Sequence, residues 1–235
     1  MIKVAIFGDS YAESTHKENP TPSWFDYLSP HFDVKNFGVR GSGVYYSYDL
    51  FLKNHEKFDK IIFIQSTPGR VMIPSNIVIE EDLYWARHIP NLHVALINGK
   101  SDKLINLKKQ FNAAVQYFQY LFDEQKEQVI DELMIDHIRR LRPDAIILKT
   151  HHDDIKEFTL WQVTVKQFEG WQKNLWISNL YNKYSEILNN HLTPENNKIL
   201  GEKILEMLQG KNIQLSVEDF LYPTEPFEKY FIERK

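Results

Sequence analysis

Residues 2–10 read IKVAIFGDS, and this stretch decides the fold. Its first six residues are mostly apolar and rich in branched side chains, which is typical of a strand buried on both faces. Gly8, Asp9 and Ser10 then turn the chain. Four further short apolar runs follow, at residues 34–37, 61–64, 94–97 and 145–148. Longer stretches with helical spacing lie between them, so the sequence predicts strands that alternate with helices.

Three of the longer stretches have clear helical signals. Residues 104–121 carry apolar side chains three and four positions apart. A second helix is predicted to end at Arg142-Pro143. Its predicted apolar face consists of Ile130, Leu133, Met134, His137, Ile138 and Leu141. His137 is interpreted as a buried, hydrogen-bonded histidine of that face. A third helix is predicted to begin after a Thr193 cap and to stop at Gly210.

This alternation predicts a mostly parallel sheet with helices on both faces, which is an α/β fold. We predict one domain over residues 1–210, with excursions near 71–91 and 155–180. The excursions are expected to cover the active edge of the sheet or to form an oligomer contact. Residues 211–235 are predicted to form a tail packed on the domain. Functional groups are expected at the carboxyl ends of the strands.

Composition excludes several classes of function. The 235-residue chain has a formal net charge of −4 and no continuous basic tract, so nucleic acid is not an expected partner. The chain contains no cysteine, which excludes disulfides, a thiol nucleophile and thiolate-bound metal. No apolar stretch is long enough to span a bilayer and no signal peptide is visible, so a cytoplasmic location is the expectation by default. No glycine-rich phosphate motif follows the first strand, and no cofactor is expected.

Ser10 stands where a strand ends and a helix can begin. A serine there is held rigidly, can be activated by a neighbouring base, and has a backbone amide free to bind an oxyanion. One alternative is an ordinary turn in which Ser10 or Asp9 only caps a helix. Another makes Asp9 the nucleophile of a phosphoryl-transfer enzyme. That chemistry favours a second aspartate two residues on, where the chain has Tyr11.

Three sequence blocks occur in an informative order. Residues 7–10, FGDS, resemble the first block of the SGNH (GDSL-type) serine hydrolases, and residues 36–43, NFGVRGSG, look like the second. His191, just ahead of a capped helix, is similar to the last. The resemblance covers residues 1–65 and 190–208. It implies a three-layer α/β/α fold with a flavodoxin-like five-stranded sheet, Ser10 as nucleophile and His191 as general base.

The resemblance also implies an oxyanion hole. The backbone amides of Ser10 and Gly41 would line it, with Gly38 as the fallback for Gly41. The third family block supplies an asparagine, but here the chain reads Gln65-Ser66-Thr67-Pro68-Gly69-Arg70. We expect Thr67 to donate in its place, with Ser66 and Gln65 as alternatives. Arg70 is interpreted as ion-paired or solvated in preference to binding a substrate anion.

The family usually has an aspartate three residues before its histidine, and that position is Leu188 here. Three explanations compete: a Ser-His dyad, an acid from elsewhere, or a site that has lost activity. Asp153 and Asp154 follow a predicted strand and are the candidates for such an acid. Residues 151–154, HHDD, could also be read as metal ligands. Adjacent residues of an extended chain point in opposite directions, so no metal site is predicted.

The sequence therefore predicts an esterase or carbohydrate O-deacylase that acts through a Ser-His acyl-enzyme mechanism. Its substrate would be a small ester or an acylated carbohydrate, and homo-oligomerisation is left open. The alternative is a binding or structural protein that keeps the fold with weakened or lost catalysis. Trp161, Trp171 and Trp176 are interpreted as core or interface residues in preference to an acyl or sugar pocket.

Overall fold

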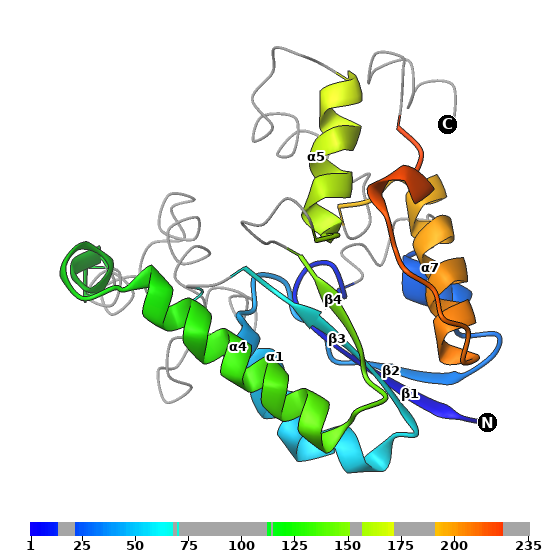
Figure 1. Ribbon diagram of the computed structural model, residues 1–235, viewed down its shortest axis with the longest axis horizontal. Helices are drawn as coiled ribbons and strands as arrows, with labels where there is room; N and C mark the ends of the chain where they lie inside the picture. The colour runs from blue at the N-terminus through cyan, green and yellow to red at the C-terminus, as the bar shows by residue number, and fades with distance from the viewer. Residues whose placement is uncertain are drawn as a thin grey trace, which may run out of the picture.

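The computed structural model describes residues 1–13, 22–67, 70, 112–113, 115–150, 157–171 and 191–222 (Figure 1). Its centre is a parallel sheet of four described strands in the order β2-β1-β3-β4. The strands are β1 (Lys3–Phe7), β2 (Asp33–Asn36), β3 (Lys60–Gln65) and β4 (Ile146–Lys149). The predicted α/β class with a parallel sheet is confirmed. The strand expected at residues 94–97 lies outside the described residues.

The central strand β1 has almost no polar side chains because both of its faces are covered. Val4 and Ile6 join one apolar cluster, whereas Ala5 and Phe7 join another on the opposite side. This division follows the alternation of side chains along a strand. Figure 1 shows α1 and α4 on one face of the sheet and α7 on the other. The three layers predicted from the sequence are therefore present.

The described helices lie between these strands and after β4. They are η1 (Trp24–Tyr27), α1 (Val44–Asn54), η2 (His55–Lys57), α4 (Glu124–Leu141), α5 (Leu160–Trp171), α7 (Pro194–Leu208) and η4 (Val217–Asp219). Residues 115–120 are also helical. The predicted start and stop of α7 are confirmed. Thr193 caps it by accepting a hydrogen bond from the Asn196 amide, and Gly210 follows its end with a positive φ of 90°.

The buried face of α4 differs from the prediction. Its buried residues are Asp131, Met134, Ile135 and Ile138. Ile130, Leu133 and Leu141, which were expected inside, are 37%, 61% and 39% exposed. His137 is exposed as well, although its Nδ1 does share a hydrogen bond of 2.5 Å with the Tyr48 hydroxyl. The predicted face was wrong because the polar side chain of Asp131 interrupts the apolar pattern on the face of α4 that is buried. Burial, with Glu127 nearby, raises the pKa of Asp131 to about 7.

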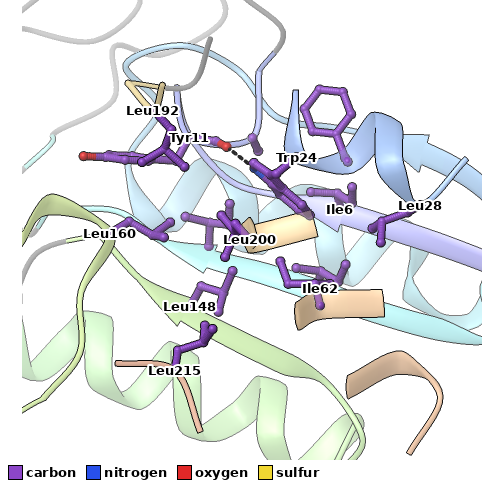
Figure 2. Close-up of a cluster of buried hydrophobic side chains, with 14 of the residues drawn as sticks. Ile6, Tyr11, Trp24, Leu28, Ile62, Leu148, Leu160, Leu192, Leu200 and Leu215 are labelled. Carbon is purple, nitrogen blue, oxygen red and sulfur yellow. Dashed lines mark hydrogen bonds between the residues drawn. The ribbon is translucent and has the colours of Figure 1, made fainter. Parts of the chain in front are cut away.

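One apolar cluster connects the sheet to the segments near its carboxyl edge (Figure 2). Leu160 and Val163 of α5 belong to it, so part of the range predicted as an excursion packs in the core. Leu215 and Phe220, in the segment after α7, are buried in the same cluster. Within the described ranges, no helix is both long and apolar enough to cross a membrane.

Candidate active site

Ser10 lies in a tight turn directly after β1. The Asp9 carbonyl accepts hydrogen bonds from the amides of Ala12 (2.9 Å) and Glu13 (3.1 Å), which curl the chain as at the start of a helix. A glycine is needed at position 8, because a Cβ there would lie 2.7 Å from the Ile64 Cβ on β3. The turn is thus pressed against the neighbouring strand. Ser10 is 7% exposed.

Asp9 anchors this turn with its carboxylate. It is fully buried, its Oδ1 accepts from the Tyr11 amide at 3.0 Å, and its Oδ2 accepts from Arg70 Nη1 at 3.1 Å. Burial raises the pKa of Asp9, and the nearby Arg70 charge opposes that rise. The ion-paired interpretation of Arg70 is confirmed. Because both carboxylate oxygens of Asp9 hold the turn, Asp9 is poorly placed to serve as a phosphoryl nucleophile.

His191 reaches Ser10 from a distant part of the sequence. Its Nε2 and the Ser10 Oγ are 2.7 Å apart, which is hydrogen-bond distance for a base and its nucleophile. His191 precedes α7 with φ at 63°, and it is the one non-glycine residue of the described ranges with a positive φ. A non-glycine residue in this conformation costs about 1–3 kcal/mol and persists only where its surroundings enforce it.

The environment of His191 keeps its imidazole neutral. Burial lowers the pKa of His191 to about 3, and the positive charges of Arg70 and Arg40 add to this effect. At neutral pH the ring can therefore accept a proton from Ser10. Asp153, Asp154 and Leu188, on which the prediction of a third triad member rests, lie outside the described residues.

The second sequence block lies against the serine turn. The Gly8 carbonyl accepts from the Val39 amide and from Ser42 Oγ, each at 3.0 Å. Gly38 donates its amide to Asn36 Oδ1 at 2.8 Å, so this amide is already used. Gly41 has φ at 72°, a conformation that favours glycine. Of the two glycines, Gly41 remains the better candidate for an oxyanion donor.

The third block follows β3 at the same edge of the sheet. Gln65 is held through its backbone carbonyl, which accepts from the Thr150 amide (2.9 Å) and Oγ1 (3.1 Å). Ser66 is 1% exposed, and its Oγ has no hydrogen-bond partner among the described residues. The Gln65 Oε1 is also buried without a hydrogen-bond partner among the described residues. Thr67, the predicted donor, is partly buried. A buried hydroxyl without a partner needs an explanation, and Ser66 is therefore a stronger candidate donor than the sequence indicated.

Sequence reasoning missed the side chains that surround His191. The Tyr11 ring lies against the imidazole with 4.6 Å between ring centroids, and its hydroxyl is 2.8 Å from Thr164 Oγ1 of α5. Trp24 Nε1 donates to the Tyr11 carbonyl at 2.7 Å (Figure 2). Gln167, one turn after Thr164, bonds the backbone of the histidine turn. The sequence signal that could have revealed these contacts is a pair of polar residues, Thr164 and Gln167, on the apolar face of a segment predicted as an excursion.

Two groups of residues that were considered and set aside as sites lie largely outside the described residues. Residues 151–154 lie outside the described ranges, and within those ranges no group of three potential ligands from histidine, cysteine, aspartate and glutamate could hold a metal ion. Of the three tryptophans considered as pocket or core residues, Trp161 is 37% exposed on α5. Trp176 and the side chain of Trp171 are not described.

Comparison with known proteins gives distant structural likenesses only. No protein-family model and no curated protein matches the chain. A protein from Desulfitobacterium hafniense DCB-2, described as lipolytic and of the G-D-S-L family, is 14% identical with a TM-score of 0.35, over 88% of this chain and 99% of that one. A lipase/acylhydrolase from Enterococcus faecalis is 13% identical with a TM-score of 0.36, over 92% of this chain and 100% of that one. An acetyl xylan esterase is 12% identical with a TM-score of 0.31, over 90% of this chain and 100% of that one.

Proposed function

We propose that this protein is a serine hydrolase of carboxylic esters, with Ser10 as nucleophile and His191 as general base. The observation that carries the proposal is the 2.7 Å contact between Ser10 Oγ and His191 Nε2. At neutral pH the imidazole of His191 is uncharged and has a lone pair for the serine proton. The substrate class, a small ester or an O-acylated carbohydrate, comes from the sequence resemblance and stays a prediction. The cytoplasmic location is a default expectation and also stays a prediction.

The proposed reaction has two halves. Ser10 Oγ attacks the ester carbonyl carbon while His191 Nε2 takes the serine proton. The imidazolium then gives that proton to the departing alcohol oxygen, which leaves an acyl group on Ser10. In the second half, His191 removes a proton from water, and the hydroxide oxygen attacks the acyl carbon. The acid product leaves, and the proton returns to Ser10.

The tetrahedral oxyanion would be bound by the amides of Ser10 and Gly41 and by one hydroxyl after β3. Ser66 and Thr67 compete for that last role. The buried Oγ of Ser66 supports Ser66, and the position of Thr67 in the sequence block that follows β3 supports Thr67. Loss of one such donor costs about 3 kcal/mol of transition-state stabilisation. Replacing each hydroxyl separately with alanine would identify the donor.

The orienting acid of the proposed site is Asp153 or Asp154, or the site works as a Ser-His dyad. Both aspartates follow β4, whose carboxyl end lies at the same sheet edge as that of β1. Burial and the positive charge of Arg70 disfavour the imidazolium that forms during the reaction. Asp153→Asn and Asp154→Asn separate these cases, because only the residue that orients His191 should slow turnover strongly.

A fluorophosphonate probe tests the proposal, because it reacts only with an activated serine. The wild type should be labelled, and Ser10→Ala should not. Ser29→Ala is the matched control, since Ser29 is exposed and its hydroxyl donates to the Phe25 carbonyl of its own turn at 3.5 Å. Absence of wild-type labelling, or equal labelling of Ser10→Ala, would reject the hydrolase. It would favour the alternative of a binding or structural protein.

A further inference from the structure

His191 holds its position in a backbone conformation that an L-residue does not adopt readily. Its φ of 63° is in the left-handed region, and the turn is not built from glycine. Proline at position 194 and the Thr193 cap fix the start of α7, but neither bonds the carbonyl of His191. Something else has to hold the turn in the conformation that points the imidazole at Ser10.

Gln167 of α5 supplies this support by bridging the two ends of the turn. Its Nε2 donates to the His191 carbonyl at 3.1 Å, and its Oε1 accepts from the Thr193 amide at 3.2 Å. The Gln167 side chain is completely buried, so water does not compete for these bonds. Figure 1 shows α5 beyond the carboxyl end of β4, from where it reaches the start of α7.

The orientation of the Gln167 amide follows from its neighbours. Asn196 Oδ1 accepts from the Leu221 amide at 2.8 Å, which makes the other end of the Asn196 side chain the donor. That donor, Nδ2, gives hydrogen bonds to Gln167 Oε1 at 2.5 Å and to the Leu221 carbonyl at 2.8 Å. The Oε1 of Gln167 is therefore fixed as an acceptor, and its Nε2 is directed to the His191 carbonyl.

We propose that Gln167 is a positioning residue that sets the distance between His191 Nε2 and Ser10 Oγ. This inference rests on the proposed hydrolase function and deepens it. Gln167 holds the histidine through its main chain, while Tyr11 lies against the ring and is itself tied to Thr164 on the same helix. One face of α5 thus carries both supports, at positions 164 and 167. An acid in a family triad acts on the histidine ring, whereas Gln167 acts on the histidine backbone.

The test compares Gln167→Met, Gln167→Glu and the control Gln162→Met. Methionine has a similar length and keeps the packing but makes neither bond. A misplaced base should lower kcat on p-nitrophenyl acetate, and the rate of fluorophosphonate labelling, by on the order of 10- to 100-fold. KM should stay within about twofold, because the substrate itself does not contact Gln167. Gln162 lies on the same helix and accepts a hydrogen bond from the Thr159 amide at its start, so its replacement tests for a general weakening of α5.

Gln167→Glu provides a readout that a purely structural role would not produce. Its protonated form can donate to the His191 carbonyl as the amide does, whereas its ionised form cannot. Burial raises the pKa of such a glutamate, so the protonated fraction grows as the pH falls from 8 to 5. The labelling rate of this variant relative to wild type should therefore rise with acidification. If Gln167→Met does not fold, this pH dependence decides the question.

The outcomes separate the two proposals. If labelled wild type and folded Gln167→Met react equally fast, or if Gln162→Met loses as much rate, the positioning role is wrong and the hydrolase stands. A ratio of Gln167→Glu to wild type that does not change with pH contradicts the role in the same way. If the wild type is not labelled, the proposed function fails and the positioning role fails with it.

Discussion

The two turns that meet at the proposed active site are built in opposite ways. The serine turn continues a central strand, and its glycine lies against β3 while Asp9 is paired with Arg70. The histidine turn has a left-handed residue and depends on side chains of α5 and α7. The first turn directly follows a strand and packs against the neighbouring strand of the same sheet. The second exists only when separate helices have docked.

The two turns also differ in how the charge of Arg70 acts on their titratable side chains. Asp9 in the serine turn is fully buried, and its carboxylate is paired with the Arg70 guanidinium at 3.1 Å. His191 shares the neighbourhood of that cation and is kept neutral. One arginine therefore stabilises the carboxylate behind the serine and opposes a positive charge on the base.

The largest expected effect comes from replacing His191. Both His191→Ala and His191→Gly should slow ester hydrolysis by about 10⁴-fold, because the base is lost. Their stabilities should differ, since glycine adopts a positive φ without the penalty of a Cβ. We expect the glycine variant to be about 1 kcal/mol more stable than the alanine variant. Urea unfolding measures this difference, and equal stabilities would show that the histidine turn stores no strain.

Replacing Arg70 should damage the serine turn. Arg70→Met leaves Asp9 buried without its partner, which should cost about 3–5 kcal/mol of unfolding free energy at neutral pH. Removing the Arg70 charge, which opposes the rise, raises the pKa of the buried Asp9 further, so the folded variant takes up a proton more readily and the loss should shrink as pH falls. Chemical denaturation at pH 5 and pH 8 measures it.

Asp9→Asn combined with Arg70→Met provides the control for this prediction. Without the buried charge, the double variant should regain most of the stability lost in Arg70→Met. A double variant as unstable as the single one would mean that Arg70 acts through its contact with the Ser42 carbonyl, at 3.2 Å, and not through Asp9.

The smallest expected effect is the response of the base to pH. With the pKa of His191 at about 3, the rate of fluorophosphonate labelling should change less than about twofold between pH 8 and pH 5. An ordinary histidine, with a pKa of about 6.5, would lose about 30-fold over this range. A fall of that size would show that the buried, cationic surroundings of His191 do not govern its protonation.

Local signals were enough for most of the fold. The continuous apolar run of β1 predicted a strand covered on both faces, and the Thr193-Pro194 start of α7 was read correctly. The docking face of α4 was not, because Asp131 hides it from any count of apolar residues. Hydrophobic periodicity shows that a helix has an apolar face. Its partner, here α1, decides which of two adjacent stripes is buried.

The sequence alone determined the strand, the turn that carries Ser10, and the helix that follows His191, because each depends on residues adjacent in the chain. Only the tertiary structure decided that Ser10 and His191, 181 positions apart, meet at 2.7 Å. It also decided that Gln167 would bond the histidine turn and that Arg70 would pair with Asp9. These contacts need a particular side chain, in a particular orientation, from another element. No local pattern encodes such an encounter.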